Sequence, residues 1–541
     1  MKELGWKTLR CAGLAALLAL ACGCHKKAEQ ADGSLTPKVV DLGTNVGALV
    51  ELTKPQPVPV EGYGLVGGLP GTGSAFCPPQ LRSYLKQYIL TQLPTERVNL
   101  DQLLDSKNTA VVRLEGQVPA TASAGDHFDV QVSLIPGSEA TSINEGWLYK
   151  ADLVARGTFG VDTKPLGTVE GAVFIASPGT GESRFKTGHI IGGGRAAFEY
   201  AAILHLRRSD YRAASTIRNR LSERYGADVA RAVSPRDIEV HIPPEYRYRK
   251  LRFLAMVCAT YMETGEDLDR ARVEAFVQQL AVGKDKETAE IALEAIGQES
   301  AGKLAALLKA PDVEVRMRAA RCLLGLGDDR GLPLLREMAL DANSPLRKEA
   351  MEAVMVSARR NDASALAVRL LRDSDRAIVL AAYEYLRQTD DPAVRRESVG
   401  GSFELEQVIQ TNRRAIFVSR SGDPRIVLFG GPLVCSNSIF VESADRAIVV
   451  NTRAGEDSVS ITRKHPTRPG IMGPIRTDFE VRSIIRALGS ESTVASDGRL
   501  GGLGVSYAQV AAIVERLIAK EAVDAEFWQG PLPEIVVPVK K

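Results

Sequence analysis

A dense run of glycines is the part of this sequence that most resembles a chemical motif. It reads Gly62-Tyr-Gly-Leu-Val-Gly-Gly-Leu-Pro-Gly-Thr-Gly73 and contains the spacing G-x-G-x-x-G. In dinucleotide-binding proteins that spacing follows a hydrophobic strand, opens a helix and precedes an acidic residue by about 20 positions. Here prolines precede the run, a proline and further glycines complete it, and position 87 is Gln87 without an acidic neighbour. The run also lacks the Gly-Lys-Ser/Thr of a phosphate-binding P-loop.

These glycines therefore predict a structural role and no nucleotide cofactor. Glycine permits positive φ angles and close approach of two backbones, as in tight strand turns or at a contact between subunits. The positions assigned to this structural motif are Gly62, Tyr63, Gly64, Leu65, Gly67, Gly68, Gly71 and Gly73.

The remaining side chains that could perform chemistry show no catalytic spacing. No H-E-x-x-H pair, no G-x-S-x-G elbow and no paired-carboxylate site is visible. The histidines beyond the N-terminus are scattered singly: His127, His189, His205, His241 and His465. We predict no catalytic residue, no metal ligand and no cofactor.

The N-terminus has the features of an export signal. Basic residues precede an apolar stretch that runs from Cys11 to Cys24 and is followed by His25 and two lysines. This stretch is too short to span a hydrocarbon core of about 30 Å as a helix, so we expect no transmembrane segment in the mature protein. Residues 1–24 are predicted to be a lipoprotein-type signal peptide.

Two cysteines in this signal are candidates for lipidation. Small residues precede both Cys22, which we prefer, and Cys24, as in the cleavage sites of bacterial lipoproteins. The alternatives are an ordinary signal without lipid and a metal site at Cys22-Gly-Cys24-His25, which lacks a second ligand pair. The four cysteines beyond the signal, Cys77, Cys258, Cys322 and Cys435, lie far apart and show no disulfide framework.

Charge indicates no nucleic-acid partner. With 68 basic and 66 acidic side chains, the net charge is only +2, which provides no large attractive field for polyanions. The segment 207–252 is locally basic, with eleven Arg and one Lys against six acidic residues. For an exported chain we interpret it as a solvated face or a subunit contact, with anionic cell-wall polymer or lipid as the less favoured alternative.

The texture of the sequence divides the chain into several parts. After a polar, proline-containing tether at 25–56, short apolar segments and two helices predict a mixed region at 57–265, including a helix from Asp210 to Gly226. Strand patterns return in a second region at 402–541. The fold class is therefore α+β, with strand-rich regions interrupted by an all-α insert.

The insert, at 284–397, shows a fixed period. Val315, Leu346 and Ala377 are 31 residues apart, and a set of alanines keeps the same spacing. Such periodicity is typical of stacked helical pairs of the HEAT type. One irregular helical bundle without true repetition is the alternative.

Several ordered motifs resemble those of bacterial flagellar P-ring proteins. The glycine run is similar to their opening motif, and Ser106-Lys-Asn-Thr-Ala-Val-Val and Ala124-Gly-Asp-His-Phe-Asp-Val-Gln-Val-Ser133 follow in the family's order. Val449-Val-Asn-Thr-Arg-Ala-Gly455 and Leu503-Gly-Val-Ser-Tyr resemble the family's carboxy-terminal portion.

The resemblance implies a structural subunit of a periplasmic ring around the flagellar rod, not an enzyme. Its expected partners are other copies of itself, the rod, the L-ring and an unknown partner of the helical repeats, with membrane contact only through a lipid anchor. The expected location is the periplasm, with an outer-membrane anchor if the signal is lipidated. The alternative is a P-ring-derived envelope lipoprotein that acts as an adaptor through its repeats and is not flagellar.

Overall fold

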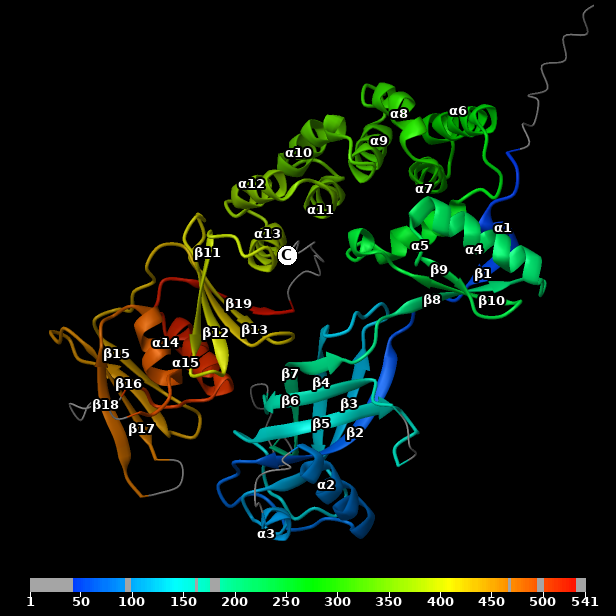
Figure 1. The fold of residues 1–541 in the computed structure, drawn as a ribbon. Helices are drawn as coiled ribbons and strands as arrows, with labels where there is room; N and C mark the ends of the chain where they lie inside the picture. Colours follow the sequence, from blue (N-terminus) through cyan, green and yellow to red (C-terminus); the bar gives the residue numbers. More distant parts are fainter. Residues whose placement is uncertain are drawn as a thin grey trace, which may run out of the picture. The chain divides into compact units, whose positions relative to one another are not determined.

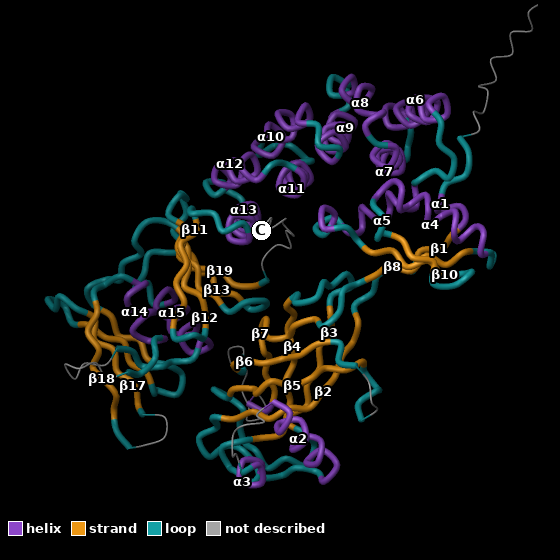
Figure 2. Tube along the Cα trace, viewed as in Figure 1, coloured by secondary structure: helices purple, strands orange, loops and turns teal. Residues whose placement is uncertain are grey.

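The computed structural model describes residues 42–92, 99–160, 164–175, 185–465, 469–493 and 501–531. The lipidation candidates Cys22 and Cys24 lie outside these residues. Leu42 begins one compact unit that contains the described chain, and its helices and sheets confirm the predicted α+β class (Figures 1 and 2). Among the described helices, none has the length and apolar character needed to cross a bilayer.

Six antiparallel strands close a β-barrel in the order β2-β3-β4-β7-β6-β5. Its interior is filled by alternating aliphatic residues, for example Val130 and Val132 of β4, as expected for strands with one buried face. Leu81 and Leu85 of helix α2 pack with Leu65 of the barrel in a separate small core. The barrel strands are β2 (Val58–Gly67), β3 (Ala110–Val118), β4 (His127–Leu134), β5 (Trp147–Ala155), β6 (Gly167–Ala172) and β7 (Thr187–Ala196), and the adjoining helices are α2 (Pro79–Gln92) and α3 (Leu100–Leu104).

A four-stranded antiparallel sheet follows, with the order β1-β8-β10-β9 and helices packed on it. Helix α4 begins after the N-cap Asp210 and ends at Gly226, as predicted. Residues 46–52, within the predicted tether, form α1 and β1 because Val46 and Val50 pack into the core of this sheet. The elements are α1 (Val46–Leu49), β1 (Val50–Leu52), β8 (Ala201–Leu206), α4 (Tyr211–Tyr225), β9 (Ala230–Ala232), β10 (Asp237–His241) and α5 (Lys250–Ala259).

Helices α6 to α13 form the helical array. The alanines Ala319, Ala350 and Ala381, 31 residues apart, are all buried at equivalent positions of α9, α11 and α13, because small residues let neighbouring helices pack closely. The helices are α6 (Glu266–Val282), α7 (Lys286–Ile296), α8 (Ala301–Leu307), α9 (Val313–Gly325), α10 (Leu332–Leu340), α11 (Arg347–Ser357), α12 (Arg360–Leu370) and α13 (Arg376–Gln388).

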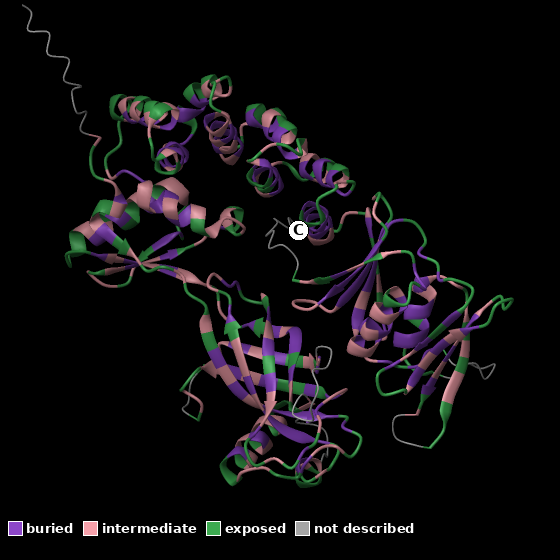
Figure 3. Cartoon of the chain, turned by 180° about the vertical axis from the view of Figure 1, so that it is seen from behind, coloured by how far each residue is buried: buried purple, intermediate pink, exposed green. Residues whose placement is uncertain are grey.

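The chain then returns to strands and forms two sheets. In the first, ordered β11-β12-β14-β13-β19, the central strands β13 and β14 are buried on both faces, whereas the edge strands β11 and β19 are partly exposed (Figure 3). Phe417 faces the core shared with α13, whereas the adjacent Ile416 faces the core shared with α14 and α15. The elements are β11 (Val394–Val399), β12 (Phe403–Val408), β13 (Ala415–Ser419), β14 (Arg425–Phe429), β15 (Ile439–Glu442), β16 (Ile448–Thr452), β17 (Val459–Lys464), β18 (Ile471–Thr477), α14 (Val481–Gly489), α15 (Tyr507–Ala519) and β19 (Glu526–Gly530), of which β15–β18 form the second sheet.

Candidate functional site

The glycine motif lies in and just after barrel strand β2. A Cβ atom on Gly62 would lie 2.4 Å from the carbonyl oxygen of Asp152 in β5, so this glycine permits close contact between the two strands. Gly68 and Gly71, beyond the strand, both have φ of +74°, which favours glycine. The amide of Gly71 donates to the side chain of Asn108 at 3.0 Å. These glycines shape the barrel end and its following turn.

The first end of the helical array contains an unusual group of charges, which we call the junction cluster. It comprises Arg249, the N-cap of α5, Arg252 of α5, Glu290 and Glu294 of α7, and Arg318 and Arg321 of α9. Both carboxylates are almost completely buried. The cluster therefore connects the sheet-bearing region to the array through charged groups withdrawn from water.

Glu290 is the centre of the junction cluster. It accepts two parallel hydrogen bonds from Arg321, each of 2.6 Å, and further ones from Arg252 at 2.8 Å and Arg318 at 2.9 Å. Burial opposes ionisation, but the guanidinium groups of Arg321 and Arg252 outweigh it and hold the pKa of Glu290 below its ordinary value. Glu290 is thus an ionised carboxylate with both oxygens satisfied, which is the condition under which a buried charge is tolerated.

Glu294 completes the connection one helical turn later. It accepts from Arg252 Nε at 2.6 Å and from Arg249 Nη1 at 3.0 Å. Arg249 also donates to the carbonyl oxygen of Gly325 at the end of α9, and a Cβ on Gly325 would lie 2.6 Å from the Glu294 carboxylate. Four guanidinium groups thus surround two carboxylates, and the spacing of these residues along three helices brings them to one point.

Sequence reasoning missed the junction cluster. Glutamates four apart and arginines three apart fall on one helix face, but that pattern is equally typical of a solvated face. The prediction that the basic segment 207–252 is a solvated face or a subunit contact is thus incomplete, because Arg249 and Arg252 form ion pairs with buried carboxylates of the same chain. What could have identified them is the position of Glu290 and Glu294 among buried alanine and leucine positions of α7.

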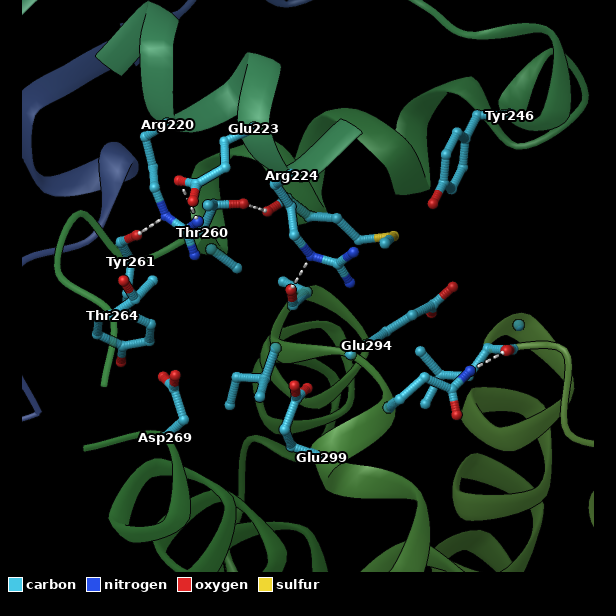
Figure 4. Close-up of a pocket in the computed structure, with 18 residues that line it drawn as sticks. Arg220, Glu223, Arg224, Tyr246, Thr260, Tyr261, Thr264, Asp269, Glu294 and Glu299 are labelled. Carbon is cyan, nitrogen blue, oxygen red and sulfur yellow. Dashed lines mark hydrogen bonds and ion pairs between the residues drawn. The ribbon is translucent and has the colours of Figure 1, made fainter. Parts of the chain in front are cut away.

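A cavity of about 560 Å³ adjoins the junction cluster. It lies between α4, the turn after α5 and the end of α7 (Figure 4). Arg224 donates to the carbonyl oxygen of Ala295 at 3.0 Å, and Arg220 donates to that of Tyr261 at 2.8 Å. The lining arginines therefore bind backbone groups at helix ends, and the cavity is part of the attachment of the array.

A second set of contacts joins the barrel to the carboxy-terminal sheets. Asp129 of β4 accepts from the amides of Gly192 at 2.6 Å and Gly422 at 3.0 Å. Nδ1 of His127 lies 3.3 Å from Asp423, which also accepts from Arg387 of α13 at 3.0 Å. Asp423 raises the pKa of His127, and His127 in turn holds the pKa of Asp423 well below its usual range. Glu145 makes a further contact with Arg463 at 3.3 Å.

The potential metal ligands and the cysteines do not form a site among the described residues. Within the described residues no group of three or more potential ligands is arranged to hold a metal ion. The four cysteines in that part of the chain are free thiols, and burial raises the pKa of Cys435 to about 12. The thiol of Cys322 lies beside the junction cluster, and its pKa is also raised by burial, so it is a poor nucleophile.

Comparison with known proteins identifies two segments. Residues 46–294 match the family model of the flagellar P-ring protein, and residues 273–355 match HEAT repeats. Both resemblances inferred from the motifs and the 31-residue period are confirmed. The first match contains the barrel, the four-stranded sheet and α7 up to Glu294; residues 402–541 lie outside it.

Relatives that match the chain carry the name flagellar P-ring protein. The protein from Wolinella succinogenes is 31% identical over 208 residues, which are 36% of this chain and 56% of the relative. That from Shewanella oneidensis is 29% identical over 238 residues, 41% of this chain and 63% of the relative. That from Albidiferax ferrireducens is 32% identical over 208 residues, 35% of this chain and 52% of the relative. The chain thus spans a little over half the length of these relatives.

Proposed function

We propose that this chain is a self-assembling structural subunit of a periplasmic ring around the flagellar rod, and not an enzyme. Its partners are other copies of itself, the rod and the L-ring, and it uses no cofactor. The match of residues 46–294 to flagellar P-ring proteins carries this proposal. The helical array adds a contact surface, and a lipid on Cys22 or Cys24 anchors the subunit to the outer membrane.

The geometry of the junction cluster supports a composite subunit. The P-ring match ends at residue 294, and Glu294 is itself bound by Arg249 and Arg252 from within the matched region. At its other end, α13 covers a face of the carboxy-terminal sheet. Side-chain contacts therefore attach the array at both ends. Stacked helical pairs of this kind form extended binding surfaces.

Electron microscopy of basal bodies from a deletion strain tests the flagellar assignment. We expect the P ring and swimming to be lost, and both to return when the intact gene is supplied. An intact ring with normal swimming in the deletion strain would refute the assignment and favour the non-flagellar adaptor. Mass spectrometry of the mature N-terminus decides separately between Cys22, Cys24 and no lipid.

A test of the role of the array should change its surface residues and leave the array in place. Deleting residues 286–396 would leave Arg249 and Arg252 without their carboxylates and expose the sheet face under α13. Charge reversals at the exposed residues Lys348, Glu349 and Glu352 of α11 leave both attachments in place. If the array is a contact surface, rings still form and a partner is lost; full function in every assay would show that this part of the array contacts nothing essential.

A further inference from the structure

Four arginines of the P-ring-like region remain without a hydrogen-bond or ion-pair partner among the described residues. Arg207, Arg208, Arg212 and Arg236 are all exposed, and no hydrogen bond or ion pair joins their side chains to any described group. Other arginines of the same basic segment are occupied: Arg231 binds Glu239, and Arg220 binds Glu223. We call these four residues the arginine surface.

Hydrogen bonds between two connections, the loop from β8 to α4 and the turn from β9 to β10, hold the arginine surface together. The amide of Leu206, at the end of β8, donates to the carbonyl oxygen of Arg236 at 2.7 Å, and the amide of Asp210 donates to Pro235 at 2.9 Å. The end of β8, the start of α4 and the turn between β9 and β10 therefore meet at one edge of the sheet (Figure 1). The four guanidinium groups project from one restricted area.

The local balance of charge is positive. Asp210 is the nearest carboxylate in sequence, and it accepts from the amide of Arg212 as the N-cap of α4. Asp237 accepts from Ser234 and lies 2.6 Å from Nδ1 of His205. These two carboxylates offset part of the charge of the four arginines, and Asp237 also interacts with Arg236, but the balance of charge on the surface stays positive.

Two large apolar side chains accompany the arginines. Tyr211 is 72% exposed and Val233 is 58% exposed, and both lie next to members of the arginine surface in the same loops. An aromatic ring beside cationic side chains is typical of surfaces that contact the interface of a bilayer, where the ring inserts at headgroup level and the cations meet phosphate. An anionic polymer in water provides no apolar layer for these two side chains.

The start of β1 lies beside the same surface, whereas Leu42 lies against α6, where its carbonyl oxygen accepts from Arg272 at 2.8 Å. The amide of Arg207 donates to the carbonyl oxygen of Leu49 at 3.0 Å, and Leu42 precedes Leu49 by a short extended stretch and α1. These dimensions place Leu42 within about 20 Å of Leu49. A lipid on Cys22 or Cys24 would be joined to Leu42 by about 20 residues, which reach at most about 70 Å.

We propose that the arginine surface binds the anionic headgroups of a phospholipid bilayer. An acyl anchor together with a basic surface gives more stable attachment than either alone. The surface would orient the subunit on the membrane, with the edge that carries β8 and the start of α4 against the headgroups. This inference does not depend on ring assembly, since it concerns a single chain.

Vesicle sedimentation with residues 25–541, the chain without the predicted signal peptide and both lipidation candidates, tests this inference without any contribution from an acyl group or the signal peptide. We expect it to bind phosphatidylcholine vesicles with about 30% phosphatidylglycerol at least about tenfold more tightly than pure phosphatidylcholine. The affinity should fall as salt rises from about 0.1 M to about 0.5 M. Equal binding to both vesicles, or none to either, would overturn the proposal.

Variants with equal charge change separate the surface from net charge. The reversal R207E/R208E/R212E/R236E should abolish the preference for anionic vesicles, whereas the control reversal R218E/R231E/R270E/R359E should retain most of it. Replacing the same four arginines with lysine should preserve binding, because the contact depends on charge. If the first reversal binds as the unmodified chain does, or if only purified anionic cell-wall polymer is bound through these arginines, the membrane assignment is wrong.

Discussion

At its first end the helical array meets the region around α5 through six charged side chains, whereas at its last end α13 shares a continuous apolar core with a sheet, and buried ion pairs lie beside that core. Around α5, the apolar cores stay separate: Phe253 belongs to the core of the four-stranded sheet, and Leu293 belongs to the core of the array. Around α13 there is one continuous core, which contains Tyr383, Phe429 and Trp528.

The difference shows two ways of fixing an inserted array. Apolar burial contributes roughly 25 cal/mol per Å² and is tolerant of orientation, so it supplies stability at the α13 end. A buried carboxylate needs its guanidinium partners in particular positions, so the junction cluster constrains the angle between α5, α7 and α9. The α13 end also contains buried ion pairs: Glu406 of β12 accepts from Arg387 of α13 at 2.8 Å, and Glu384 of α13 accepts from Arg425 of β14 at 2.9 Å. These pairs add to the apolar core there, whereas the junction cluster lies between two separate cores.

The largest effect is expected from truncating the apolar end. Phe429 is fully buried, and its ring centroid lies 5.2 Å from that of Trp528 and 5.5 Å from that of Tyr383. Phe429→Ala should lower the free energy of unfolding by about 3–5 kcal/mol, since it removes a large side chain and leaves a cavity. Urea unfolding followed by tryptophan fluorescence measures the loss. Phe440→Ala, at a 57% exposed position, is the control and should change stability by about 0.5 kcal/mol or less.

A substitution in the junction cluster should lower the free energy of unfolding slightly less than Phe429→Ala does. Glu290→Gln removes the carboxylate that Arg252, Arg318 and Arg321 share, and it should destabilise by about 3 kcal/mol because guanidinium charge is left buried and unpaired. The same unfolding assay applies, with the exposed Glu287→Gln on α7 as control.

A double-mutant cycle identifies the cause of that loss. If unpaired charge is responsible, the double variant Glu290→Gln/Arg321→Met should lose less free energy of unfolding than the two single variants do together. The difference should be at least about 1 kcal/mol. Strict additivity would show that the cluster acts only through packing, and the contrast between the two ends of the array would disappear.

The helices with a periodic sequence pattern could be predicted from the sequence, but the contacts between elements distant in the sequence could not. The 31-residue spacing identified the array, and the stripe Ala214, Ile217 and Leu221 with its caps identified α4. Such patterns are local, because one helix or strand determines them. Glu290 and Arg252 are 38 residues apart, and their pairing depends on how two helices pack, which no local pattern records.

The residues of the candidate site show the same difference between local patterns, which could be predicted, and long-range contacts, which could not. The glycine motif could be assigned a structural role because its surroundings exclude a phosphate site, yet its contact with Asp152 of β5 depends on barrel closure. His127 looked like one of several scattered histidines, and its contacts with the carbonyl oxygen of Gly192 and with Asp423, almost 300 residues later, both depend on tertiary packing. Composition and residue spacing therefore do not predict which polar side chains from distant parts of the chain contact one another.

A smaller effect should follow from changing donor geometry at the charged end while keeping its charge. Arg249 binds Glu294 and the Gly325 carbonyl with two different nitrogens. Lysine offers one compact ammonium and cannot reproduce both contacts, so Arg249→Lys should destabilise by about 1–1.5 kcal/mol. Arg231→Lys, at a largely exposed pair with Glu239, should be nearly silent in thermal unfolding. Equal effects at the two sites would show that charge alone matters in the junction cluster.

The smallest effect concerns pH at the apolar end, where Asp423 joins His127 to Arg387 of α13. Asp423 raises the pKa of His127 in the folded state, so this pair stabilises the fold fully below the unfolded value of about 6.5 and loses that contribution as pH rises through the folded pKa. The His127 side chain is 38% exposed, and solvent screening limits the contribution to about 0.5 kcal/mol.

Thermal unfolding of His127→Gln across pH 6 to about pH 9 checks the sign, since the pair depends on protonated imidazole. The unmodified chain should be the more stable one near pH 6, and the difference should vanish at the alkaline end. His189→Gln, an exposed position on β7, should show no such trend. A difference that grows with pH would mean that His127 acts as a neutral hydrogen-bond donor to Gly192, so that the α13 end is fixed by apolar contacts without help from this charge.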